Sequence, residues 1–132
     1  AKEQSAQYYQ RFFLLCDDFL TVIPDHKYAK DFVNMMGAVY FRNRKYEELL
    51  EKFAGYENGE MNPSKGFVNR PDFRNSPGMA TAHYMSGLAL LATGRFEEAK
   101  PMLSAVVGVN VEGLPLDDGG LSTYDDADEA GE

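Results

Sequence analysis

A pattern of two short helices joined by a tight turn occurs twice in this chain, and it constrains the fold more than any other feature. In the second copy, Gly87 offers a position without a side chain where another helix can come close, and Ala99 and Leu103 lie four residues apart on the following helix. The first copy, from Gly37 to Phe53, has the same spacing. Short helices of this kind bury their apolar faces only by stacking on neighbouring helices. The pattern therefore predicts an all-α fold of stacked helix pairs.

Hydrophobic periodicity indicates about five helices, because apolar residues recur three or four apart in five segments. These segments are residues 5–23, 26–42, 46–53, 77–93 and 95–107. Pro24 ends the first helix, and Asp25 is placed to cap the second with its carboxylate. Gly55 is expected to end the third helix. Ser76 and Pro77 are expected to start the fourth, as N-cap and first-turn residues.

Residues 55–78 interrupt the helical pattern with several glycines and prolines and no sustained period. A loop of this length inside a compact domain is often functional or mobile. Its basic and aromatic residues are candidate contacts, namely Lys65, Phe67, Arg70, Phe73 and Arg74. Three alternatives stay open for them: they close over a groove, contact a neighbouring subunit, or fold back onto the acidic end of the chain.

The charge of the chain is unevenly distributed, although the net value is −8. Residues 1–114 hold 14 acidic and 13 basic residues, whereas residues 115–132 hold the other 7 acidic residues and no basic one. We therefore expect a helical domain at 1–113 and a flexible acidic tail at 114–132. A nucleic-acid partner is not expected, because phosphate binding needs clustered Lys and Arg. No apolar run approaches the length of a membrane span.

Catalytic and metal-binding patterns are not found in the sequence. His26 and His83 are far apart and each stands alone, whereas a metal site needs three or four converging ligands. The single cysteine, Cys16, lies on an apolar helix stripe and is expected to be a small buried hydrophobic residue. Adjacent glutamates at 47–48 and 97–98 point about 100° apart on a helix and do not form an acid/base pair. We expect neither an enzyme nor a bound cofactor.

Both copies of the pattern resemble the tetratricopeptide (TPR) repeat, a helical hairpin that stacks into a superhelix. The likeness rests on Gly87, Leu90, Gly94, Phe96, Ala99 and Leu103, on Gly37, Tyr40, Tyr46, Leu49 and Phe53, and on a half copy at Phe12, Cys16, Phe19 and Pro24. It covers about residues 8–107. Two departures are the 50-residue spacing of the copies, against about 34 in a regular array, and the lack of the usual Trp. The resemblance implies a TPR-like superhelix with a long inserted loop.

In TPR proteins the first helix of each repeat lines a concave groove that holds a partner. Carried over to this sequence, the groove residues are Asp31, Asn34, Met35, Phe41, Arg42, Thr81, Tyr84, Met85, Leu88 and Leu91. The Lys/Asn/Arg set with which some TPR domains hold a C-terminal carboxylate does not stand at these positions. A groove of mixed polar and apolar residues suits a peptide that binds through apolar anchors. For Met85 and Leu88, packing between repeats is the alternative.

A shorter segment, from Cys16 to Ala29, is similar to repeats of outer-membrane assembly lipoproteins of the BamD type. The likeness covers about 14 residues. The sequence itself leaves the compartment open between cytoplasm and periplasm, since the chain begins with neither a signal peptide nor an initiator Met.

The sequence thus predicts a non-catalytic module that binds a protein or peptide segment in its groove. The alternative is a structural subunit that docks into a larger assembly through its loop and the ends of its stack. The apolar start of the first helix, with Tyr8, Tyr9, Phe12 and Phe13, supports the alternative, because an uncapped repeat leaves apolar surface bare. Self-association through this helix is a further expectation.

Overall fold

The structure, a computed structural model, describes residues 2–107 of the chain. Most of these residues are helical, which confirms the all-α prediction at this coarse level. The helices are α1 (Lys2–Val22), α2 (Ala29–Arg42), α3 (Tyr46–Leu49), the π-helix η1 (Leu50–Ala54), α4 (Met79–Ala92) and α5 (Phe96–Val107). The acidic tail predicted at 114–132 lies outside the described residues.

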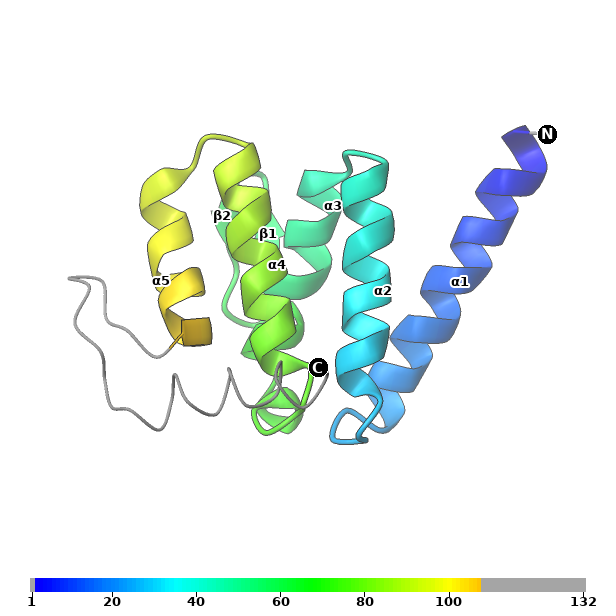
Figure 1. The fold of residues 1–132 in the computed structure, drawn as a ribbon, viewed down its shortest axis with the longest axis horizontal. Coiled ribbons are helices and arrows are strands. Elements are labelled where there is room, and N and C mark those ends of the chain that lie inside the picture. The colour runs from blue at the N-terminus through cyan, green and yellow to red at the C-terminus, as the bar shows by residue number, and fades with distance from the viewer. Residues whose placement is uncertain (1, 108–132) are drawn as a thin grey trace, which may run out of the picture.

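Four helices stand side by side in chain order, and α3 lies behind α2 and α4 (Figure 1). The N-terminal helix α1 packs on α2 through the apolar stripe seen in the sequence. Cys16 and Leu20 are almost fully buried in this contact, and Phe13 stacks on Tyr40 with 4.6 Å between the ring centroids. The stripe therefore forms a helix, as predicted, and α2 covers its centre.

The helices α2 and α4 lie next to each other and run in the same direction (Figure 1). A Cβ atom placed on Gly78 would meet the Ala29 carbonyl at 3.1 Å, so the starts of the two helices are in contact. Near their middles, a Cβ on Gly37 would lie 2.9 Å from the Met85 Cγ. Two contacts in the same order along both helices require a parallel arrangement.

The two turns that connect the helix pairs have the same hydrogen bonds at an offset of 50 residues. In the first turn, the Lys45 N–H donates to the Tyr40 carbonyl at 2.8 Å, and in the second the Arg95 N–H donates to the Leu90 carbonyl at 2.8 Å. Each turn also holds one residue with positive φ, Arg44 at 56° and Gly94 at 80°. The repetition seen in the sequence is therefore also a repetition of the backbone.

Gly87 brings α4 and α5 together, as the sequence pattern predicts. A Cβ atom at this position would lie 2.5 Å from Leu103 Cδ2, so any side chain would displace Leu103. Ala99 on α5 and Leu90 on α4 are both buried. The antiparallel pair α4–α5 is thus built around a glycine contact.

The segment 55–78 is folded onto the body and contains short regular elements. It holds the strands β1 (Tyr56–Glu57) and β2 (Glu60–Met61) and the 3₁₀ helices η2 (Phe67–Asn69) and η3 (Pro71–Phe73). The two strands pair antiparallel across Asn58 and Gly59, both of which have positive φ. Asn-Gly is the commonest signal for such a hairpin turn. The segment predicted as a loop therefore contains a very short hairpin.

Two predicted helix starts differ from the structure. Asp25 does not cap α2, because the helix begins at Ala29 after a series of turns, and Tyr28 precedes it without a side-chain cap. The helix α4 begins at Met79, two residues later than Pro77. There the Ser76 hydroxyl accepts a hydrogen bond from the Gly78 N–H at 3.0 Å in the preceding turn. In both places a local turn competes with the first helical turn.

Replacing Gly55 by Ala should destabilise the fold more than replacing Gly59. Both glycines have positive φ (79° and 85°), where an alanine costs about 1–2 kcal/mol. A Cβ on Gly55 would also lie 2.2 Å from the Lys65 carbonyl oxygen, whereas no atom lies within 4 Å of one on Gly59. We expect Gly55→Ala to lose about 1–3 kcal/mol more in urea unfolding than Gly59→Ala. Equal losses would contradict this account of the contact between Gly55 and the inserted segment.

Candidate functional site

The outer side of α4 exposes apolar residues with no charge among them. The helix has 14 residues, none of which is Asp, Glu, Lys or Arg. Ala82, Ser86 and Leu90 are buried on its inner side, whereas Tyr84 and Leu91 are 40% and 39% exposed on the outer side. A helix that is apolar on all sides is usually covered on all sides. The outer side of α4 is therefore a candidate surface for a further chain.

The neighbouring helix α2 adds a mixed polar and apolar strip to this surface. Met35 is 42% exposed, and Asn34 beside it is also exposed. Asp31 lies in the first turn of α2 and Arg42 in its last turn, so opposite charges mark the two ends of the helix.

The ten residues predicted to line the groove lie on these two adjacent helices, but they are not equally accessible. Six are exposed, namely Asp31, Asn34, Met35, Arg42, Tyr84 and Leu91, and four are half-buried, namely Phe41, Thr81, Met85 and Leu88. Met85 fills the space over Gly37, and Phe41 packs edge-on against Tyr46 at 5.4 Å. For Met85 the structure therefore supports the alternative that it packs between the two copies.

The five candidate contacts in the inserted segment are mostly engaged within the chain. Phe67 and Phe73 are 3% and 0% exposed and stack on each other at 5.2 Å. Lys65 pairs with Glu57 at 2.8 Å, and Arg70 pairs with Asp72. Arg74 alone of the five is exposed with no ion pair to any residue in 2–107. The two aromatic rings, named among the candidate contacts, thus lie in the core of the protein.

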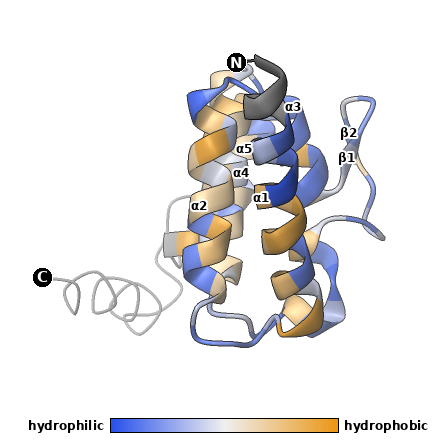
Figure 2. Cartoon of the chain, turned by 90° about the vertical axis from the view of Figure 1, so that its right-hand side faces the viewer, coloured by the Kyte–Doolittle hydropathy of each residue, from blue (hydrophilic) through white to orange (hydrophobic). Residues whose placement is uncertain are grey.

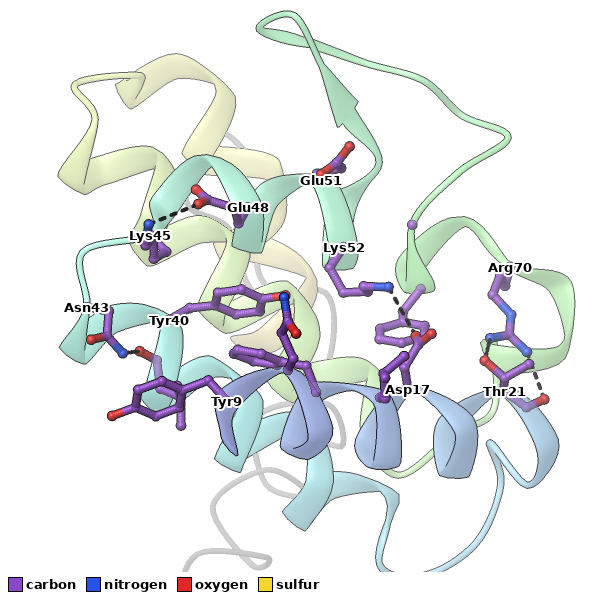
Figure 3. Close-up of a pocket in the computed structure, with 16 residues that line it drawn as sticks. Tyr9, Asp17, Thr21, Tyr40, Asn43, Lys45, Glu48, Glu51, Lys52 and Arg70 are labelled. Carbon is purple, nitrogen blue, oxygen red and sulfur yellow. Dashed lines mark hydrogen bonds and ion pairs between the residues drawn. The ribbon is translucent and has the colours of Figure 1, made fainter. Parts of the chain in front are cut away.

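A cleft of about 1180 Å³ lies between α1 and the body of the protein (Figure 3). Its apolar lining includes Phe13, Leu14, Val39 and Phe67, and its polar lining comes from α1, α3, η1 and the inserted segment. Sequence patterns did not indicate this cleft, because three stretches far apart in the chain form it, within residues 9–21, 39–52 and 66–70. The one sequence signal for the cleft is the apolar stripe of α1, which is wider than the surface that α2 covers.

Polar groups on the two sides of this cleft are bonded to each other. Lys52 donates to Asp17 at 3.2 Å, and Arg70 donates to the Thr21 carbonyl at 3.3 Å (Figure 3). Burial and the nearby carboxylates of Glu48 and Asp17 raise the pKa of Tyr40 to about 12, so its phenol stays protonated at neutral pH. The two hydrogen bonds hold α1 against the body.

The adjacent glutamates of the two copies form separate ion pairs and hydrogen bonds. Glu47 accepts from Arg95 at 2.9 Å and so joins α3 to the turn before α5. Glu98 accepts from the Tyr56 hydroxyl at 2.6 Å; burial and this bond raise the pKa of the phenol. Each glutamate of a pair thus has its own partner, as expected for side chains that point in different directions.

The histidine of α4 has a structural contact. His83 Nδ1 lies 3.2 Å from the Met79 carbonyl one turn earlier, and burial lowers the pKa of the ring. Across residues 2–107, no three His, Cys, Asp or Glu side chains come close enough to hold a metal ion.

Comparisons with known proteins find no matching protein family, no matching curated protein and no matching solved structure. In the part of the chain that the structure describes, every helix is too short or too polar to cross a membrane.

Removing one ring of the inserted segment should unfold the protein far more readily than removing its exposed cation. Phe73 is fully buried, so Phe73→Ala leaves a cavity and is expected to cost about 3–5 kcal/mol. The neighbouring Arg74→Ala is the control and should change stability by less than about 0.5 kcal/mol. Urea unfolding of both variants measures the difference. A small effect of Phe73→Ala would show that the segment is not part of the core.

Cys16 should react slowly with iodoacetamide in the folded protein. The side chain is 1% exposed, and burial, with Asp17 nearby, raises the pKa of its thiol from 9.0 to about 11. At pH 8 this leaves about 100-fold less thiolate than the ordinary value would. Mass spectrometry should find full alkylation in urea and little without it. Equal rates in both conditions would contradict the burial of this helix face.

Proposed function

We propose that this chain is a non-catalytic protein-binding module of the TPR-like class. It holds a segment of a partner against the outer sides of α2 and α4. The partner segment has apolar side chains that contact Tyr84 and Leu91, and it is extended or helical.

Three features support the TPR-like class. The helices α2 and α4 run parallel and side by side, as first helices of successive repeats do. The connecting turns share their hydrogen bonds at an offset of 50 residues. Gly37 and Gly87, at equivalent positions, are each in close contact with a neighbouring helix, Gly37 with Met85 of α4 and Gly87 with Leu103 of α5. The inserted segment at 55–78 accounts for the long spacing. In this interpretation α1 is the second helix of a preceding repeat.

The feature that best supports a binding function is the uncharged outer side of α4. Tyr84 is an aromatic side chain with a hydroxyl group, a residue type enriched among the strongest contacts of protein interfaces. Around it, Leu88 and Leu91 provide apolar area, and Met35 on α2 provides an adaptable contact. Asp31 and Arg42 at the two ends of α2 give the surface a polarity that can orient the bound segment.

The second candidate function is a structural subunit of a larger assembly. The exposed apolar residues of α1 favour it, since Tyr8, Leu15 and Val22 are 79%, 65% and 75% exposed. The inserted segment does not favour it, because Phe67 and Phe73 are buried. In this alternative the end of the stack at α1 is the docking surface.

Peptide selection against the immobilised full chain tests the proposed groove. Peptides from a random display library that bind the wild-type protein are measured by fluorescence anisotropy against Tyr84→Ala and Leu91→Ala. We expect each substitution to weaken binding at least about tenfold, because each removes an apolar contact at the centre of the surface. Thermal unfolding should change little, since both side chains are substantially exposed.

Leu14→Ala is the matched control for this experiment. Leu14 is an exposed leucine, at 62%, but it lies on α1 beside the cleft. Its removal should leave peptide affinity unchanged. If only Leu14→Ala abolishes binding, the peptides occupy the cleft and the groove assignment is wrong. If no peptide binds the wild-type chain, a peptide-binding function is contradicted.

A further inference from the structure

A second apolar stripe runs along the outer side of α1, next to the stripe that packs on α2. It consists of Tyr8, Phe12, Leu15, Phe19 and Val22, which follow each other in steps of four, three, four and three residues. This alternation is the heptad pattern of a coiled-coil seam, with Phe12 and Phe19 at the a positions and the other three at the d positions. The stripe covers 15 residues of one helix, from Tyr8 to Val22.

The d positions of this seam are uncovered in the monomer. Tyr8, Leu15 and Val22 are 79%, 65% and 75% exposed. Phe12 and Phe19 are half-buried at the edge of the contact with α2, where Phe19 stacks on Phe32 at 4.1 Å. Figure 2 views the protein from this side, with α1 in front of the other helices and hydrophobic residues coloured orange along part of it.

Two opposite charges flank the seam at equivalent positions. Arg11 directly precedes Phe12, and Asp18 directly precedes Phe19, so both occupy the g position of their heptads. Both side chains are exposed. Within residues 2–107 neither of them takes part in an ion pair.

We propose that α1 pairs with α1 of a second copy of this chain in an antiparallel coiled coil. In this arrangement Phe12 packs against Leu15 of the partner subunit and Tyr8 against Phe19 of the partner subunit. Arg11 then lies beside Asp18 of the partner subunit, and the two-fold symmetry repeats this pair on the other side. One helix face thus complements itself in shape and in charge.

The charges select this arrangement over the other pairings of the same stripe. Sliding the antiparallel helices by one heptad, so that Leu15 faces Phe19 of the partner subunit, places the two Asp18 side chains side by side, and like charges repel. In a parallel pair, Arg11 would face the position of Cys16, which carries no charge and is buried. The seam involves one helix per subunit, so the interface is small and the dimer is weak. This inference is independent of the proposed groove, because it concerns only α1.

Sedimentation equilibrium of the full chain, from about 10 µM to about 1 mM, tests the proposal. The apparent mass of the wild type should rise from that of one chain toward that of two. Leu15→Glu places a charge in the middle of the seam and should remain monomeric throughout. Leu14→Glu is the matched control, because this equally exposed leucine points about 100° away, toward the cleft, and dimerisation should persist. A monomeric wild type, or dimerisation of Leu15→Glu as strong as that of the wild type, overturns the proposal.

A charge exchange distinguishes the antiparallel pair from any other interface. Arg11→Glu and Asp18→Arg should each weaken the dimer about five- to tenfold, because each converts two attractive pairs into repulsive ones. The double variant Arg11→Glu, Asp18→Arg restores both pairs and should dimerise like the wild type. Circular dichroism checks that all variants keep their helix content. A double variant as weak as the single ones overturns the proposed arrangement.

Discussion

The close approach of α4 to the helices on both sides of it organises the described structure. On one side Met85 of α4 lies over Gly37 of α2, and on the other Leu103 of α5 lies over Gly87 of α4. Each contact needs a position without a side chain, because a Cβ atom would lie within 2.9 Å of its neighbour. With two sides of α4 fixed in this way and its inner side covered by η1, only the outer side is left open by residues 2–107. The apolar residues there are exposed as a direct result of this packing.

Much of this arrangement could be predicted from the sequence, because local rules govern it. The apolar period places the helices to within a few residues, and the two glycines mark where helices meet. Gly55 and Gly94 both have positive φ, and each follows a helix that ends close to the position predicted from the sequence pattern. Asp25 shows the limit of such rules, since a favourable capping residue has no effect when the neighbouring residues form a turn. The likeness to TPR repeats concerns how the helix pairs stack, and it stays a proposal.

The inserted segment could not be predicted in the same way, because its contacts are not periodic. Phe67 and Phe73 are buried by the body to which the segment returns, and no local spacing marks them as core residues. The Asn69 amide donates to the Ala54 and Lys65 carbonyls and so ties the segment to the end of η1. Arg70 then reaches α1. The segment thus forms one wall of the cleft. Because the contacts of the segment could not be predicted from the sequence, the cleft could not be predicted either.

The position of α1 at the end of the row explains why this helix carries two apolar stripes where one would suffice. A helix inside a stack has a helix on each side, whereas α1 has a described helix of the row on one side only, α2, and is otherwise bonded to η1 and the inserted segment across the cleft. The stripe around Cys16 and Leu20 faces α2, and Tyr8, Leu15 and Val22 of the heptad stripe are left exposed. The two open surfaces also differ in chemistry. In the proposed binding mode, the outer side of α4 has no charge that selects one orientation of the bound segment, and Asp31 and Arg42 on α2 supply it. The seam on α1 has Arg11 and Asp18 on its own edge, and opposite charges one heptad apart are what a helix needs to pair antiparallel with itself.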